Sequence, residues 1–149
     1  MTTIAANKTS IACDLQFTHT GGIKFRGATK IVELTPEVAE KLFGCKKAII
    51  GFCGNADIWG ELVGWFNSPD NKPPRCKDIE LLMLTDEGKI YHGTTLANWM
   101  EIKEPYFAIG SGMHLAIAAM AAGSDPKKAI QIASKHDPNT GMGVKTYKL

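Results

Sequence analysis

The chain begins Met1-Thr2-Thr3, and Thr2 is the first residue whose chemistry is of interest. A start methionine that precedes a residue as small as threonine is usually removed, which would leave Thr2 at the N-terminus. An α-amine titrates at roughly 7.7–8.0, so the amine of an N-terminal threonine can take the proton of its own hydroxyl near neutral pH. The hydroxyl then becomes a nucleophile, which it is not by itself. Taken alone, the simpler interpretation is favoured, in which Thr2 merely begins an edge strand.

Four further groups of residues could act together with Thr2. Asp14 ends a predicted strand, and Lys30 begins another sixteen residues later. Residues 51–54 (Gly-Phe-Cys-Gly) lead from a strand into a helix, so their N–H groups would lie at a positive helix end. Residues 110–112 (Gly-Ser-Gly) form a second strand-to-helix corner, and residues 137–141 (Asp-Pro-Asn-Thr-Gly) form a helix-to-strand turn. Each group also has an ordinary interpretation, because surface salt bridges and tight turns use the same residue types.

The elements that would position these residues follow from periodicity and from turn signals. Asn7-Lys8 separates the first two strands, and Asn tolerates the positive φ of a tight hairpin. The second pair of strands is expected to be a hairpin of residues 23–27 and 30–34. The strands are predicted at residues 2–6, 10–16, 23–27, 30–34, 46–52, 79–85, 89–93, 98–102, 106–110 and 143–149, and the helices at residues 35–44, 55–66, 114–123 and 125–136.

The predicted helices carry clear boundary signals. Thr35 is a suitable N-cap with Pro36 at the first helical position, and Gly44 follows the end of the same helix. Asp125 and Pro126 repeat the start signal in the last helix. The order of hairpins, helix, hairpins, helix pair and strand predicts an α+β fold, in which two antiparallel sheets carry helices on their outer faces. No repeat and no domain boundary is evident, so residues 1–149 are expected to form one domain.

Composition excludes several classes of function. The hydrophobic content of 44% and charged content of 21% are typical of a soluble globular protein, and the net charge of +2 gives no case for nucleic acid. The apolar runs are too short to span a membrane, and there is no signal peptide. The four cysteines show neither a CxxC pair nor histidines at zinc-site spacing. We therefore expect free thiols, no metal, no cofactor and a cytoplasmic location.

Considered as a set, these motifs resemble the proteasome β-subunit and HslV-type threonine peptidases, a family of N-terminal-nucleophile (Ntn) hydrolases. The order and intervals of the motifs carry the resemblance, since none is specific by itself. It implies an αββα sandwich of two antiparallel sheets flanked by helices. The matching stretches are TTIAA, ACDLQFT, TKIVEL, IIGFCGNAD, FAIGSG and the D-x-x-T-G turn, which together run from Thr2 to Val144.

The resemblance also implies a role for each matching residue. Thr2 would be the nucleophile, with Asp14 and Lys30 as the carboxylate and lysine beside it. Lys30, as a nearby cation, would disfavour protonation of the Thr2 amine and hydroxyl. Gly54 matches the glycine whose N–H forms the oxyanion hole, although this alignment needs a one-residue deletion before Ala56. The residues that surround and orient the threonine amine would be Ser111, Asp137 and Thr140.

Substrate-binding residues are implied in the same way. Thr18 matches the threonine whose backbone pairs with the substrate strand. The side chains expected to shape the pocket for the residue before the cut are Phe17, Ala28, Val32 and Phe52. All four are apolar, which predicts cleavage after apolar residues.

The resemblance implies partners as well: a polypeptide substrate, a homo-oligomeric ring and an ATP-dependent unfoldase of the AAA+ class. The chain departs from the family between Phe66 and Ile79, where too few residues remain for the second long helix of its relatives. This departure affects the surface on which an ATPase would dock. Two alternatives stay open: a catalytically silent, ring-forming structural or regulatory protein that keeps Met1, and an Ntn amidase that acts on a small molecule. The amidase is disfavoured because the chain has no additional substrate domain.

Overall fold

The first hairpin brings the start of the chain into a sheet. The computed structural model describes residues 2–19, 21–70 and 72–149. Strands β1 (Thr3–Asn7) and β2 (Ser10–Asp14) pair antiparallel. The Asn7 side chain holds the turn, because its Oδ1 accepts N–H groups of Thr9 and Ser10, each at 2.9 Å. The turn therefore uses a side-chain hydrogen bond, and not the positive φ expected at Asn7.

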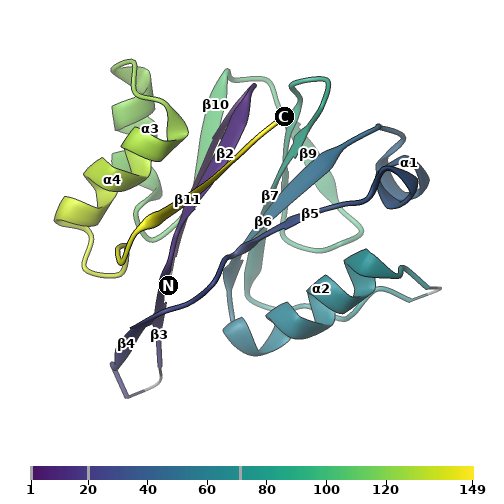
Figure 1. Cartoon of the computed structure of the whole chain (residues 1–149), viewed down its shortest axis with the longest axis horizontal. Helices are drawn as coiled ribbons and strands as arrows, with labels where there is room; N and C mark the ends of the chain where they lie inside the picture. The colour runs from purple at the N-terminus through teal and green to yellow at the C-terminus, as the bar shows by residue number, and fades with distance from the viewer. Residues whose placement is uncertain (1, 20, 71) are drawn as a thin grey trace.

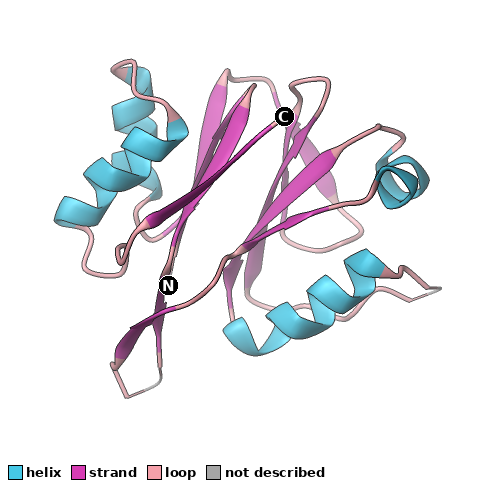
Figure 2. Ribbon diagram, in the orientation of Figure 1, coloured by secondary structure: helices cyan, strands magenta, loops and turns pink. Residues whose placement is uncertain are grey.

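Within the described residues, the strands form two main antiparallel sheets and a small hairpin (Figures 1 and 2). The β1 sheet has the order β10-β1-β2-β11, the β6 sheet has the order β5-β6-β7-β8-β9, and β3 pairs with β4. The remaining strands are β3 (Gln16–Thr18), β4 (Lys24–Arg26), β5 (Ile31–Glu33), β6 (Ala48–Gly54), β7 (Ile79–Thr85), β8 (Ile90–Gly93), β9 (Trp99–Ile102), β10 (Tyr106–Gly110) and β11 (Val144–Lys148). The helices are α1 (Pro36–Phe43), the 3₁₀ turn η1 (Ala56–Ile58), α2 (Trp59–Asn67), α3 (Met113–Ala121) and α4 (Pro126–His136).

The layers are helix, sheet, sheet and helix. Figure 1 shows α3 and α4 on the outer side of the β1 sheet, and α1 and α2 on the other side of the molecule, beside the β6 sheet. The predicted αββα sandwich of antiparallel sheets is confirmed. The helix boundary signals are confirmed too, since Thr35 and Asp125 accept the N–H groups of Val38 and Lys128 at 3.4 and 2.7 Å. Among the described residues, no helix has both the length and the apolar character needed to cross a membrane.

Alternating side chains of β1 and β2 build two of the core layers. Ile4 and Ile11 point between the sheets, whereas Ala5 and Ala12 pack against α3 and α4. The sheets approach closely at Gly51, where a Cβ would lie 2.7 Å from Cγ2 of Ile4. The third core layer lies between the β6 sheet and helices α1 and α2.

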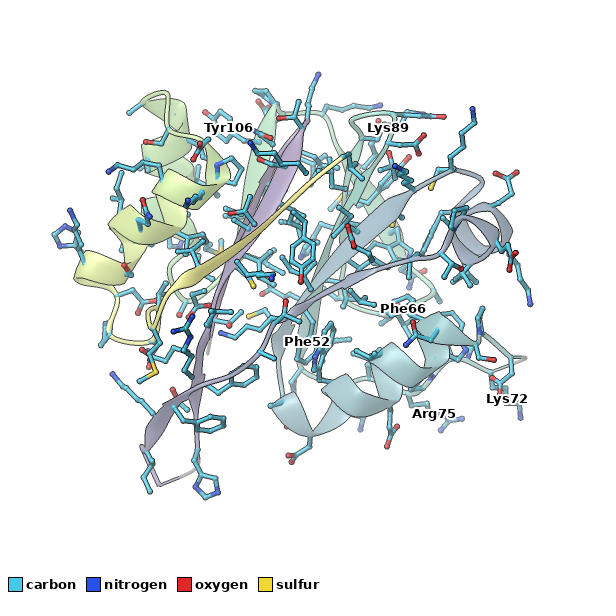
Figure 3. The ribbon with its side chains drawn as sticks, in the orientation of Figure 1. Phe52, Phe66, Lys72, Arg75, Lys89 and Tyr106 are labelled. Carbon is cyan, nitrogen blue, oxygen red and sulfur yellow. The ribbon has the colours of Figure 1, made fainter. Side chains whose placement is uncertain are left out.

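Phe52 and Phe66 anchor that third layer. Both side chains are buried, with exposures of 4% and 1%, and they belong to the same cluster as buried residues of β7. Figure 3 shows them on β6 and α2, at the junction of the sheet with the helix. The alternation of β6 thus sends Phe52 to the helix side, away from the inter-sheet core.

The second pair of strands differs from the prediction. Residues 24–26 pair with residues 16–18, and residues 31–33 pair with β6, so the expected hairpin of 23–27 with 30–34 is wrong. All three residues of β4 are exposed, while Ile31 and Val32 are buried on opposite faces of β5. Consecutive buried residues require a strand that is covered on both faces, as β5 is. β4 has the sequence Lys-Phe-Arg and is too polar for such a position.

The predicted strand 10–16 also divides into two. β2 ends at Asp14 and β3 begins at Gln16, whose N–H donates back to the Asp14 carboxylate at 3.3 Å. This bend directs β3 and β4 away from the β1 sheet. The hairpin thereby becomes one wall of the site described next.

Candidate active site

Asp14 and Lys30 form a buried ion pair, which excludes a surface salt bridge. Their side chains are 0% and 4% exposed, and Lys30 Nζ lies 2.8 Å from Asp14 Oδ1. The ammonium also donates to the Gln16 carbonyl at 2.5 Å and lies 4.9 Å from the centre of the Phe17 ring. Two acceptors and an aromatic face therefore hold this cation in one place.

Further donors surround the Asp14 carboxylate. Its Oδ1 also accepts the Thr2 hydroxyl and the Thr3 N–H, each at 3.0 Å. Its Oδ2 accepts the N–H groups of Gln16 at 3.3 Å and Gly141 at 3.1 Å. A buried charge needs this number of partners to offset the loss of water. Asp14 thus joins the start of the chain to Lys30 and to the turn before β11.

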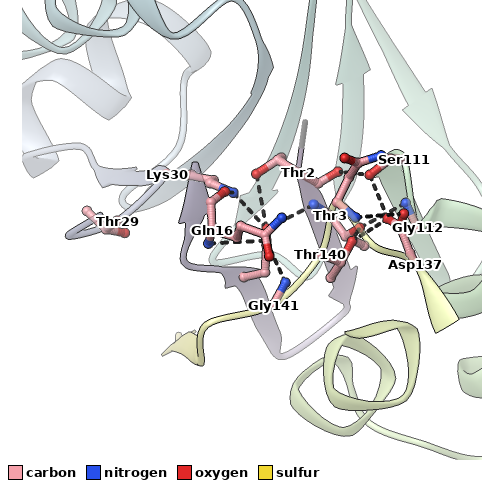
Figure 4. Close-up of polar contacts among 12 residues, drawn as sticks. Thr2, Thr3, Gln16, Thr29, Lys30, Ser111, Gly112, Asp137, Thr140 and Gly141 are labelled. Carbon is pink, nitrogen blue, oxygen red and sulfur yellow. Dashed lines mark hydrogen bonds and ion pairs between the residues drawn. The ribbon is translucent and has the colours of Figure 1, made fainter. Parts of the chain in front are cut away.

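Thr2 lies directly before β1, with 4% of its surface exposed. Its hydroxyl shares the Asp14 Oδ1 acceptor with the Lys30 ammonium (Figure 4). On the other side, the Thr2 carbonyl accepts the Ser111 N–H at 2.8 Å. The hydroxyl is therefore held beside a fixed cation, and the backbone that carries it is tied to a second group of polar residues.

That second group is centred on Asp137, which follows the last residue of α4. Its Oδ2 accepts the hydroxyl groups of Ser111 at 2.6 Å and Thr140 at 2.5 Å, and its Oδ1 accepts the Asn139 N–H at 3.1 Å. Partial burial would raise the pKa of the Asp137 carboxyl, but the hydrogen bonds from Ser111 and Thr140 outweigh it and hold the pKa below its ordinary value. The carboxylate is consequently ionised at neutral pH.

The two glycines of residues 110–112 fit the N-terminus closely. Gly110 has a φ of +93°, and a Cβ there would lie 1.8 Å from the Thr2 carbonyl oxygen. A Cβ on Gly112 would lie 2.4 Å from Oγ1 of Thr3. Residues 110–112 can approach Thr2 and Thr3 this closely because neither glycine carries a side chain.

A cavity of about 480 Å³ opens beside Thr2. Thr2, Lys30 and Gly54, the last residue of β6, are among the residues that line it. The other lining residues are Phe17, Thr18, His19, Phe25, Phe52, Cys53, Asn55, Ala56 and Asp57. The cavity thus combines aromatic side chains with Thr2 and Lys30.

Gly54 and the residues that follow it form the predicted strand-to-helix corner. Asn55 caps η1 by accepting the Asp57 N–H at 3.0 Å, and α2 continues from there. Gly54 has a φ of +131°, and a Cβ would lie 2.3 Å from the Asp78 carbonyl oxygen. Its role as an oxyanion donor stays a prediction, which is compatible with its place on the cavity wall.

The residues expected to bind substrate divide into two groups. Phe17, Thr18 and Phe52 line the cavity. Ala28 is exposed and Val32 is buried in the core between the β6 sheet and its helices, and neither is among the cavity-lining residues. The part of these two residues in substrate binding stays a prediction.

Cys53, which also lines the cavity, carries a thiol that could act as a nucleophile. Burial raises the pKa of its thiol to about 11, and the nearby Glu80 carboxylate adds to this shift. The thiolate is the reactive form of cysteine, and almost none is present near neutral pH. The Cys53 thiol is therefore protonated near neutral pH and poorly suited to act as a nucleophile.

Several contacts of the site were not predicted from the sequence. Thr3 and Gln16 were not singled out, and Gly112 and Gly141 were placed in candidate turns without a role. Gln16, Gly112 and Gly141 contribute backbone groups, and Thr3 contributes both its N–H and its hydroxyl. Backbone groups leave no signal in residue type. The Thr3 position did carry a signal in the sequence. Its polar hydroxyl lies on the same face of β1 as Ala5, an apolar residue.

Comparison with known proteins gives structural matches alone. No protein-family model matches the chain, and neither does the sequence of any curated protein. The solved structure of BPH from Thiobacillus denitrificans in complex with epoxomicin matches with a TM-score of 0.72 and 16% identity, over 99% of this chain and 97% of that chain. Eukaryotic HslV from Trypanosoma brucei matches with a TM-score of 0.65 and 19% identity, over 99% and 98%.

A second kind of protein has the same architecture. An Anbu mutant from Hyphomicrobium sp. strain MC1 matches with a TM-score of 0.75 and 9% identity, over 100% of this chain and 82% of that chain. Similarity at such low identity establishes the fold and not the activity. The chain therefore has the αββα fold that is also found in HslV and Anbu.

Proposed function

We propose that the chain is a threonine peptidase subunit, with Thr2 as its nucleophile once Thr2 is the N-terminal residue. The observation that carries this proposal is the buried cluster of Thr2 Oγ1, Asp14 and Lys30 Nζ on the wall of an aromatic cavity. Met1 lies outside the described residues, and its removal is part of the proposal. The fold shared with HslV supports it as well.

The reaction begins with the Thr2 hydroxyl. Its oxygen attacks the carbonyl carbon of the scissile peptide while its proton passes to the Thr2 α-amine. The Gly54 N–H stabilises the resulting oxyanion, an interaction worth on the order of 10²–10³ in rate at such sites. The C–N bond then breaks, and the amine returns the proton to the leaving nitrogen. Water hydrolyses the remaining ester on Thr2, with the amine again as base.

The other polar residues of the site are proposed to position the reacting groups and to favour their reactive protonation states. The Lys30 cation disfavours protonation of the amine and favours loss of the hydroxyl proton. Asp14 fixes the position of Lys30 through the 2.8 Å ion pair. Ser111, Asp137 and Thr140 lie on the side of the Thr2 backbone and are proposed to orient the amine.

Covalent labelling tests the nucleophile. Protein purified without an N-terminal tag is treated with a β-lactone, or with epoxomicin, the compound bound in the Thiobacillus denitrificans structure. We expect the intact mass to show loss of one methionine and gain of one inhibitor, and peptide mapping to place the adduct on Thr2. Thr2→Ala should give no adduct, whereas Cys53→Ser should keep it.

The alternative without activity predicts the opposite masses. A catalytically silent protein would keep Met1 when it is purified from its native source, and it would form no adduct. That result would remove the peptidase proposal and leave the fold unchanged.

The substrate is proposed to be unfolded polypeptide, cut after apolar residues. Phe17, Phe25 and Phe52 give the cavity its apolar character. A peptide library should therefore be cut mainly after apolar side chains, and cutting after Arg or Glu would contradict this.

An AAA+ unfoldase is proposed as a partner by analogy with the family that the sequence motifs resemble. The isolated protein should accordingly cut a polypeptide when it is unfolded and spare the same polypeptide when it is folded.

Self-association would restrict access to such a site. Anbu from Pseudomonas aeruginosa, which matches with a TM-score of 0.69 and 7% identity, was solved as a helical assembly. Repeated head-to-tail contacts close into a ring when the rotation completes a circle, and otherwise they form a helix. We infer a closed ring with Thr2 facing the lumen. Native mass spectrometry that shows monomer alone at micromolar concentrations would contradict it.

A further inference from the structure

The Thr3 hydroxyl lies between two parts of the site. The residue is 0% exposed, and in β1 it stands opposite Gly110 of β10. Its Oγ1 accepts the Gly112 N–H at 2.9 Å and lies 2.5 Å from Oγ1 of Thr140. A Cβ on Gly112 would lie 2.4 Å from this oxygen, so a side chain at residue 112 would collide with the hydroxyl.

The proton positions along this chain of groups follow from chemistry. Each hydroxyl has one proton to donate. Thr140 lies 2.5 Å from the ionised Asp137 carboxylate and donates its proton there. The oxygen of Thr140 must then accept from Thr3, and Thr3 in turn accepts from Gly112. The bonds therefore run in one direction, from the Gly112 N–H through Thr3 and Thr140 to Asp137.

The backbone N–H and the hydroxyl of Thr3 are both connected to groups that contact Thr2. The Thr3 N–H, which belongs to the peptide bond after Thr2, donates to Asp14 Oδ1 at 3.0 Å. The same oxygen accepts the Thr2 hydroxyl and the Lys30 ammonium. Ser111, which donates its N–H to the Thr2 carbonyl at 2.8 Å, precedes the residue that donates to the Thr3 hydroxyl. Thr3 thus connects the Asp14 side of the site with the Asp137 side.

We propose that Thr3 is a positioning residue for the Thr2 nucleophile, and this inference rests on the proposed peptidase function. The hydroxyl of Thr3 keeps the Ser111 corner and the Thr140 turn in register with the Thr2 backbone. Loss of that hydroxyl would leave the Gly112 N–H without its acceptor and the Thr140 oxygen without its donor. Thr2 would then shift relative to Lys30 and to the cavity.

Thr3→Val tests this proposal, because valine keeps the shape of threonine and removes the hydroxyl. We expect kcat to fall about 10- to 100-fold, the effect of a misplacement on the order of 1 Å, while KM changes less than about twofold. The maximal rate of β-lactone labelling should fall by the same factor. Thr3→Ser, which restores the hydroxyl, should recover most of both rates.

A matched control separates positioning from loss of a buried hydroxyl. The Oγ1 of Thr146 on β11 is buried and has no hydrogen-bond partner among the described residues. Thr146→Val should therefore leave kcat, labelling and thermal unfolding near wild-type values. All variants are assayed well below the midpoint of their thermal unfolding, so that a loss of activity reports on folded protein.

Amide hydrogen exchange provides a readout that needs no activity. Thr3→Val should speed exchange of the Ser111 and Gly112 amides at least about tenfold, and Thr146→Val should not. Wild-type kcat and unchanged exchange in folded Thr3→Val would overturn the inference. Failure of the proposed function differs from this, because it would appear in the wild-type protein as an N-terminal Thr2 that forms no adduct.

Discussion

Replacing Lys30 with alanine should lower peptidase activity by at least two orders of magnitude, comparable to removal of an oxyanion donor. Lys30 Nζ lies 2.8 Å from Asp14 Oδ1, the oxygen that also accepts the Thr2 hydroxyl. Without this cation the amine of Thr2 would be protonated more readily, and its hydroxyl would be harder to ionise. The measurement is kcat/KM on a fluorogenic peptide, together with the labelling rate of Thr2.

The same replacement also carries a cost in stability. Removal of one partner of a buried ion pair typically costs about 3–5 kcal/mol. Asp14 keeps its hydrogen bonds from Thr2, Thr3, Gln16 and Gly141, so we expect the lower end of that range. Urea unfolding measures this cost, and activity is compared only where circular dichroism shows folded protein.

Lys30→Arg is the finer variant. It keeps the charge but replaces a compact ammonium with a planar fork, which cannot meet Asp14, the Gln16 carbonyl and the Phe17 ring in the same way. We expect it to be nearly as damaging as alanine. Most of the activity surviving in Lys30→Ala, with the assembly intact, would show that the catalytic assignment is wrong.

Replacing Gly110 with alanine should abolish both activity and labelling. A Cβ there would lie 1.8 Å from the Thr2 carbonyl oxygen and 2.8 Å from its carbon, which are backbone atoms and cannot rotate away. The φ of +93° adds strain. Positive-φ strain of about 1–2 kcal/mol and overpacking of about 1–3 kcal/mol give a total destabilisation of about 2–5 kcal/mol.

Gly123→Ala is the matched control for that variant. Gly123 also has a positive φ, +102°, but a Cβ there meets no atom within 4 Å among the described residues. This variant should lose about 1–2 kcal/mol of stability from backbone strain and keep its activity. Equal loss of activity in both variants would show that contact with Thr2 is not the cause.

Local signals made most elements predictable. Thr35 with Pro36 and Asp125 with Pro126 marked helix starts, because a side-chain cap and a fixed φ act within a few residues. Short runs of apolar residues likewise located β1, β6 and β7. Strand partners were harder, since residues 24–26 and 31–33 are close in sequence but pair with different neighbours.

The candidate site was predictable in its side chains and not in its backbone. Asp14, Lys30, Ser111, Asp137 and Thr140 could be named because their motifs, in order and interval, resemble those of the HslV-type family. The hydrogen bonds between them could not, because many use backbone groups. The Gln16 carbonyl and the N–H groups of Ser111 and Gly141 are chemically the same as those of other residues, so residue type does not reveal them. Such contacts depend on where the fold places distant segments, so only the folded structure reveals them.

The contacts of Asp14 limit how sequences with this fold can change. Its two oxygens join residues 2–3, 16, 30 and 141, which lie near both ends of the chain. A protein of this fold that cut no peptides would still need these connections to hold its first residues in place. In a remote sequence, an aspartate at this place would therefore indicate the architecture and not the activity.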